Sequence, residues 1–76
     1  MRKKIVQPPL GRRIAALGER QHGVVTRKQL IALGLTDPGI VRRVTDGRLW
    51  RIHRGVYAVG RPTLTLRGRF IAAVLS

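Results

Sequence analysis

The chain has 76 residues and no cysteine, and its sixteen Lys and Arg against three Asp and Glu give a formal charge of +13. This length suits one domain, and the lack of cysteine excludes a disulfide framework or a thiolate metal site. With 43% hydrophobic residues, the composition is that of a folded domain, not of a disordered polycation. So positive a domain attracts a polyanion: nucleic acid is the commonest, and acidic lipid surfaces and acidic proteins are alternatives.

The chain carries no recognisable membrane or export signal. No apolar run approaches the roughly 18 residues of a spanning helix, and the opening MRKKIVQPPLGRR lacks the apolar core of a signal peptide. We therefore expect a cytoplasmic protein with no membrane association. Residues 1–9 are predicted to be a basic flexible tail, because Pro8-Pro9 cannot lie inside a helix. The alternative is an arm that adds phosphate contacts.

Residues 10–22 predict the first helix. Its apolar residues recur at i, i+4 and i+7 and form one stripe of Leu10, Ile14 and Leu17. Gly18 costs up to about 1 kcal/mol relative to Ala in mid-helix, and Gly23 ends the helix as its C′ residue. The β-branched pair Val24-Val25 then predicts either a minimal strand or an extended link.

A capping box predicts the start of the second helix. Thr26 and Gln29 have the T-x-x-Q spacing at which each side chain satisfies a backbone N–H of the other residue. Val25 and Leu30 occupy the hydrophobic-staple positions of the same cap. Gly34 ends the helix after about two turns, too few for it to persist alone. It also opens a short turn of the helix-turn-helix type.

The third helix is predicted over about residues 38–46, with two candidate N-caps. We predict Asp37, because the proline that follows it would then lie at the first helical position. The alternative is Thr36, which would make Leu35 and Ile40 a hydrophobic-staple pair.

The faces of this third helix predict its role. Its expected inner face is made of Ile40, Val41 and Val44. The opposite face is made of Gly39, Arg42 and Asp46, with Arg43 on its flank. In helix-turn-helix proteins this face meets the major groove, where arginines reach guanine edges or phosphates. The alternative is a merely solvated face on which Arg42 pairs with Asp46.

Residues 49–53 and 56–59 predict a β-hairpin around the two-residue turn Arg54-Gly55. That register places Trp50, Ile52, Tyr57 and Val59 on one face, and Arg51, His53, Val56 and Ala58 on the other. A three-residue loop with a glycine bulge would change the pairing. The hairpin is basic in either register. Its two aromatic residues are predicted in or near the core, with stacking on single-stranded bases as the alternative.

Residues 64–75 predict a last helix, capped by Thr63 or Thr65. Its apolar residues recur at i+4 as Leu66, Phe70 and Val74, widened by Ile71 and Leu75. Either this helix packs on the preceding elements and completes their core, or it begins a longer structure. The predicted fold class is therefore mainly α with a small β-hairpin: a winged helix-turn-helix over residues 10–60, followed by a linker and C-terminal helix over residues 61–76.

The run from Ile14 to Gly60 resembles the N-terminal winged-helix domain of the AbiEi antitoxins of type IV toxin–antitoxin (abortive-infection) systems. The best-matching segments are HGVVTRKQL, the GL-T turn and GRLWRIHRGVYAVG. The resemblance implies a transcriptional regulator that binds inverted repeats in duplex DNA and represses its own toxin–antitoxin operon. Longer relatives continue past LTLRGRFIAAVLS into the C-terminal domain that antitoxin activity needs, so this chain resembles a copy that is truncated or split before that domain. Asp37-Pro38-Gly39 is less polar than the resemblance implies for the start of the third helix.

The candidate DNA-binding residues are Arg27, Lys28, Arg42, Arg43, Arg48, Arg51 and Arg54. Those of the third helix would read bases, and those of the hairpin would hold the backbone. The pair that begins the second helix would clamp a flanking phosphate.

Two other functions fit the same sequence. The stripe Leu66, Phe70 and Val74 could contact a second copy or another protein, because fold does not fix function. Charge alone could drive association with RNA. An enzyme is not expected, because three carboxylates, two isolated histidines and no glycine-rich phosphate loop leave no acid–base pair, nucleophile or metal cage. No cofactor is predicted.

Overall fold

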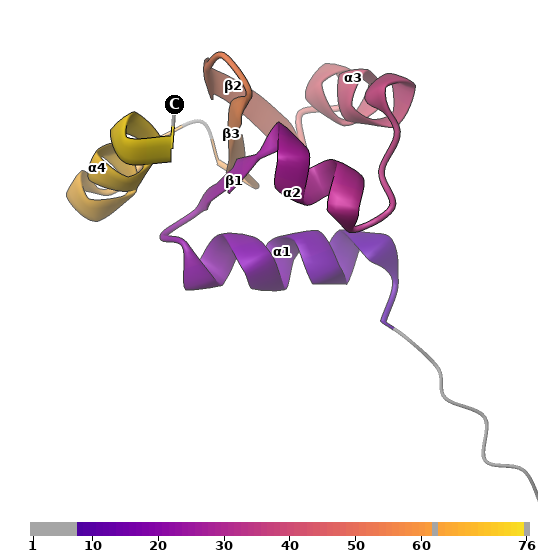
Figure 1. The fold of residues 1–76 in the computed structure, drawn as a ribbon, viewed down its shortest axis with the longest axis horizontal. Helices are drawn as coiled ribbons and strands as arrows, with labels where there is room; N and C mark the ends of the chain where they lie inside the picture. The colour runs from indigo at the N-terminus through magenta and orange to yellow at the C-terminus, as the bar shows by residue number, and fades with distance from the viewer. Residues whose placement is uncertain (1–7, 62, 76) are drawn as a thin grey trace, which may run out of the picture.

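A computed structural model describes residues 8–61 and 63–75, so most of the predicted tail lies outside the described residues. Four helices and three strands follow one another along the described chain (Figure 1). They are α1 (Leu10–Arg20), β1 (Val24–Thr26), α2 (Arg27–Ala32), α3 (Asp37–Thr45), β2 (Leu49–His53), β3 (Val56–Val59) and α4 (Leu66–Leu75). Helix, turn, helix and hairpin come in the order of a winged helix-turn-helix, which confirms the predicted fold.

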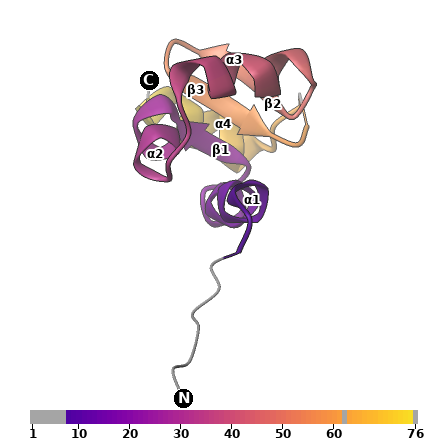
Figure 2. The same cartoon turned by 90° about the vertical axis from the view of Figure 1, so that its right-hand side faces the viewer.

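The sheet has three antiparallel strands in the order β1-β3-β2, one more than the predicted hairpin. Val24-Val25 thus belongs to a strand, because the free edge of β3 pairs Val24 with Ala58 and Val25 with Tyr57. Helix α4 covers one face of the sheet, while α1, α2 and α3 lie on the other side (Figures 1 and 2).

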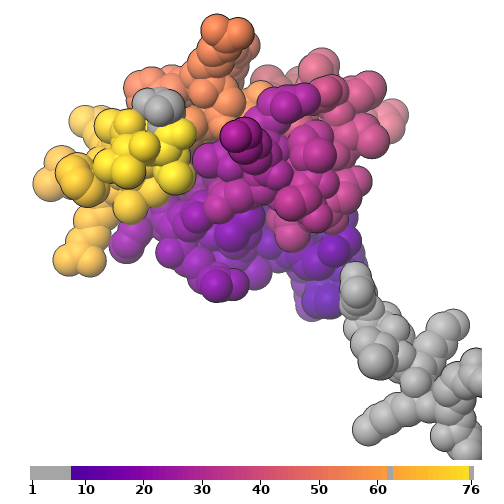
Figure 3. Space-filling model, in the orientation of Figure 1, coloured from indigo at the N-terminus to yellow at the C-terminus, as the bar shows by residue number. Residues whose placement is uncertain are grey.

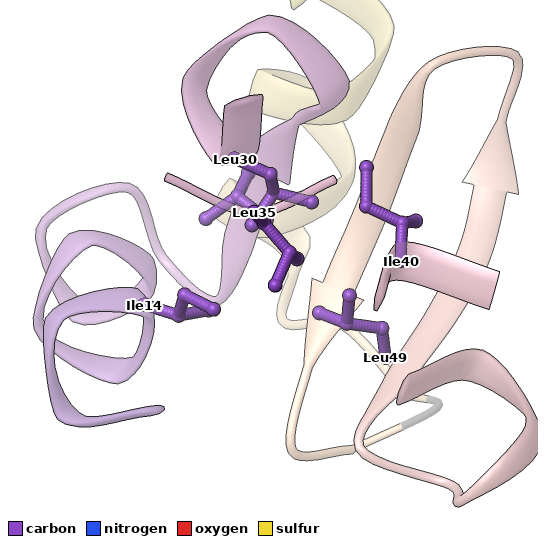
Figure 4. Close-up of a cluster of buried hydrophobic side chains, with 6 residues drawn as sticks. Ile14, Leu30, Leu35, Ile40 and Leu49 are labelled. Atoms are coloured by element: carbon purple, nitrogen blue, oxygen red, sulfur yellow. The ribbon is translucent and has the colours of Figure 1, made fainter. Parts of the chain in front are cut away.

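Each face of the sheet has its own apolar core. The larger cluster joins the three N-terminal helices to the sheet and consists of Ile14, Val25, Leu30, Leu35, Ile40 and Leu49 (Figure 4). The smaller cluster lies under α4 and consists of Val24, Val56 and Ala72. Neighbouring residues of β1 thus serve opposite faces, as the alternation of a strand requires.

Helix α1 ends at Arg20, two residues before the predicted His22. His22 adopts a φ of 59° and Gly23 a φ of 87°, so the chain has already left the helical region. The predicted stripe is confirmed, since Ile14 is buried and its two partners pack against the larger cluster. A Cβ on Gly18 would lie 3.1 Å from Val59, so glycine allows α1 to approach the sheet closely.

The capping box of α2 is confirmed. The backbone N–H of Gln29 donates to Oγ1 of Thr26 at 3.1 Å, and the backbone N–H of Thr26 donates to Oε1 of Gln29 at 3.0 Å. The Gln29 side chain also exchanges amide hydrogen bonds with Gln21 at 2.9 and 2.8 Å. This pair, which no local signal indicated, ties the end of α1 to α2.

The predicted N-cap of α3 was wrong by one residue. Thr36 is the cap, and its Oγ1 accepts the backbone N–H of Gly39 at 3.1 Å. Leu35 and Ile40 both lie in the larger cluster, as the staple that accompanies this alternative requires. The physical reason is that the Asp37 carboxylate binds Arg27 instead of the helix N-terminus.

The predicted hairpin faces were also wrong. His53 pairs with Val56 as expected, but the register shifts between Arg51 and His53, so that Arg51 pairs with Tyr57 and Trp50 with Ala58. An extra residue in one strand exchanges the faces of everything beyond it. Leu49, Tyr57 and Val59 therefore contribute to the larger cluster, whereas Ile52 packs with the smaller one.

Helix α4 packs on the sheet through small residues. Thr65 caps it, because its Oγ1 accepts the backbone N–H of Gly68 at 3.0 Å. Gly68 and Ala72 are buried, and a Cβ on Gly68 would lie 2.7 Å from the His22 carbonyl oxygen. The predicted stripe points outward: Leu66 is 84% exposed, Phe70 69% and Val74 65%. None of the helices in the described parts of the chain is both long and apolar enough to cross a membrane.

Candidate nucleic-acid interface

The outward face of α3 differs from the predicted one. Ile40 is 3% exposed, but Val41 and Val44 are 64% and 38% exposed, so the expectation that all three are buried was wrong. A helix of nine residues that touches the rest of the fold on one side buries only a narrow stripe. The half-buried Gly39 and Arg43 accompany Ile40 on the inner side, and Val41 lies at the centre of the exposed one.

Arg42 and Arg43 have different surroundings. Arg42 is exposed, and within residues 8–61 and 63–75 it forms no ion pair with Asp46. Arg43 is half-buried, and its Nη1 lies 3.9 Å from the position that a Cβ on Gly11 of α1 would take. The guanidinium of Arg43 is therefore directed back toward α1, and of these two arginines Arg42 is the one on the open side of the helix.

Arg27 is bound by Asp37, which was predicted to cap the third helix. Its Nε and Nη2 donate to the two carboxylate oxygens of Asp37 at 2.9 and 2.7 Å. The side chains are 49% and 62% exposed. These hydrogen bonds and the negative charge of Asp37 raise the pKa of Arg27 above its ordinary value. The pair joins the first residue of α2 to the first residue of α3, ten positions apart, where no local pattern could indicate it.

The hairpin turn contacts the start of α2. The backbone N–H of Arg27 donates to the Gly55 carbonyl at 2.9 Å. Lys28 and Arg54 line one groove with these residues. The tip of the hairpin projects from the surface between α4 and the helix-turn-helix (Figure 3). Cations from two distant segments, α2 and the hairpin turn, thus line the same groove.

The other two hairpin cations lie apart from this groove. Arg48 is exposed just before β2 and lines a groove with Arg43 and Gly11 near the start of α1. Arg51 is exposed on β2 and stands opposite Tyr57 across the strands. The seven predicted residues therefore do not form one cluster. One group lies around the hairpin turn and another near α1, and Arg42 and Arg51 are exposed but line neither groove.

No group of three or more His, Cys, Asp or Glu side chains in residues 8–61 and 63–75 could hold a metal ion. The same residues bury no polar or charged side chain in the core. The one ion pair in this part of the chain joins Arg27 to Asp37 and so partly neutralises one cation of the candidate surface.

Comparison with known protein families gives a match over residues 12–60 to the transcriptional regulators described as AbiEi antitoxins. The chain belongs to this family. No curated protein and no solved structure matched it. The AbiEi match covers most of α1, the helix-turn-helix and the hairpin, and it confirms the resemblance noted in the sequence. The family is one of transcriptional regulators and antitoxins rather than of enzymes.

Proposed function

We propose that this AbiEi-family protein binds duplex DNA upstream of its own toxin–antitoxin operon and represses transcription there. One observation carries the proposal: a member of a regulator family exposes its third helix beside a projecting cationic hairpin. Helix α3 would enter the major groove, as in other helix-turn-helix proteins. The large positive charge would supply affinity by releasing counterions from phosphates.

Under this proposal, the candidate residues have different roles in reading bases and in binding the DNA backbone. Arg42 would read a guanine edge, because it is exposed and free of Asp46. Lys28 and Arg54 would hold the DNA backbone from the groove beside the hairpin turn. Arg48 and Arg51 would add phosphate contacts. Arg27 would act more weakly than predicted, since its charge is shared with Asp37. Arg43 would support α3 from its inner side.

Fluorescence anisotropy tests the proposal, using the upstream duplex and a scrambled duplex over a range of salt concentrations. Arg42→Ala should cost about 1–3 kcal/mol on the upstream duplex and reduce the preference over the scrambled one. Arg54→Ala should lower the affinity for both duplexes by the same factor, and it should make the slope of log K against log salt shallower by roughly one unit. Equal, steeply salt-dependent binding of the wild type to both duplexes would contradict sequence-specific regulation. So would equal binding to RNA.

A second copy docked on α4 is the further candidate partner. The stripe Leu66, Phe70 and Val74 is exposed, and α4 lies across the sheet from α3, so docking there would leave α3 free for DNA (Figure 1). Inverted repeats are bound by pairs of subunits. One helix of ten residues provides less than the roughly 1,000 Å² of a stable interface, and like charges repel. The pair should therefore form on DNA, where phosphates neutralise the charge.

Phe70→Ser tests this pairing. It should abolish cooperative binding of a second copy to an inverted repeat while leaving single-site affinity unchanged, because Phe70 is 69% exposed. Ile31→Ser is the matched control, since Ile31 is also exposed but belongs to α2. Sedimentation velocity would give the state of the free protein, and titration of a half-site and a full repeat would give the cooperativity. Unchanged cooperativity in the Phe70 variant would exclude the α4 interface.

A further inference from the structure

The central position of the exposed face of α3 is taken by an apolar side chain. Val41 is 64% exposed in the middle turn of the helix. With about 100° between successive residues, Thr45 lies about 40° to one side of Val41 and Arg42 about 100° away. Both neighbours are exposed. The face that would enter a major groove therefore presents two methyl groups at its centre and a guanidinium at its flank.

The position of Val41 indicates which chemical group it would contact on DNA. Scattered exposed apolar residues are ordinary on protein surfaces, and phosphates or guanine edges would gain nothing from a valine. Among the groups that base pairs display in the major groove, the C5-methyl of thymine is apolar, and aliphatic side chains contact it. The strong positive charge and the exposed Arg42 make a nucleic acid the occupant that this face fits best.

We infer that Val41 is a specificity-determining residue that recognises thymine through its C5-methyl group, next to the base that Arg42 reads. This inference rests on the proposed DNA binding and adds a base preference to it. Recognition of this methyl group would also favour DNA over RNA, because uracil lacks the methyl group and the major groove of A-form RNA is too narrow for side chains. When Val41 buries the C5-methyl group of one thymine, the affinity for DNA should rise about fourfold.

Replacing thymine by deoxyuridine tests the inference directly. The upstream duplex is prepared with each thymine in turn replaced by deoxyuridine, and anisotropy gives the dissociation constants for wild type and variants. We expect wild type to lose about fourfold in affinity at one or two positions. Val41→Ala should abolish that loss at the same positions, and Val41→Thr, which keeps one methyl, should reduce it. Effects of deoxyuridine on the DNA itself would act equally on all proteins and cancel in the comparison.

Arg42→Ala is the control, because it should weaken binding to both forms of each duplex and keep their ratio. Circular dichroism of the Val41→Ala variant should match the wild type, since the side chain is largely exposed. Equal affinity of the wild type for the thymine and deoxyuridine duplexes would overturn the inference alone, as would an unchanged ratio in Val41→Ala. Absence of any preference of the wild type for the upstream duplex over a scrambled one would overturn the proposed function as well.

Discussion

Asp37 connects the starts of the two helices of the helix-turn-helix through an exposed ion pair. Its two carboxylate oxygens accept hydrogen bonds from Arg27, and the helix N-terminus beside it is capped by Thr36. A Thr cap contributes about 1 kcal/mol. The exposed ion pair adds little stability, because solvent screens it. Its main effect is on charge, since it partly neutralises a cation at the edge of the candidate DNA surface.

Asp37→Asn should therefore strengthen DNA binding. Without the carboxylate, Arg27 becomes available to a phosphate, and the slope of log K against log salt should steepen by up to about 0.9. Asp46→Asn is the matched control, because it removes the same charge at the other end of α3, where the described residues form no ion pair. Equal slopes for the two variants would mean that net charge alone is responsible and that Arg27 is not released.

At the scale of the element, α4 depends on one glycine. Gly68 lies against the carbonyl oxygen of His22, whose own φ of 59° forms the turn between α1 and β1. The atom that a Cβ on Gly68 would meet belongs to the backbone, so no flexible side chain could move to make room for it. The close contact brings Ala72 into the core, and the same orientation turns Phe70 outward. The packing of small residues thus decides which face of α4 is exposed.

Gly68→Ala should dislodge α4. The new Cβ would stand 2.7 Å from the His22 oxygen, and forced overpacking of this kind costs about 1–3 kcal/mol. Gly11→Ala is the matched control: its Cβ would lie 3.9 Å from its nearest neighbour, and alanine should stabilise the α1 helix by up to about 1 kcal/mol. Urea unfolding of both variants gives the two free-energy changes. A stability of Gly68→Ala equal to the wild type would mean that α4 is not held by this contact.

At the scale of the whole molecule, charge acts on folding and on binding in opposite directions. The formal charge of +13 is spread over one small domain, so like charges repel within the folded state. Salt screens this repulsion, because the Debye length falls from about 30 Å at 0.01 M to about 8 Å at 0.15 M. The same salt weakens attraction to phosphates.

The urea midpoint should therefore rise as salt is added over this range, while DNA affinity falls. Arg20→Gln, which removes an exposed cation at the end of α1 away from the candidate surface, should reduce the rise in the midpoint and leave DNA affinity nearly unchanged. Circular dichroism during urea titration at several salt concentrations measures the midpoint. A midpoint that falls with salt would show that ion pairing, rather than repulsion, dominates the fold.

Features that depend only on residues close together in the chain could be predicted from the amino-acid sequence. The capping box of Thr26 and Gln29, the end of α2 at Gly34 and the hairpin turn at Arg54-Gly55 were all predicted, because each needs residues only a few positions apart. The order of these elements was enough to identify the winged helix-turn-helix. The segments that carry the family resemblance lie within the same matched range.

Which side of each helix or strand is buried depends on contacts between residues far apart in the chain. Val41 and Ile40 are both aliphatic, and only the contacts of α3 with the rest of the fold bury one and expose the other. The register shift in β2 exchanged the predicted faces. Arg27 and Asp37 meet only because the turn brings two helix starts together. Burial and pairing depend on residues far apart in the chain, and a local pattern contains no information about those partners.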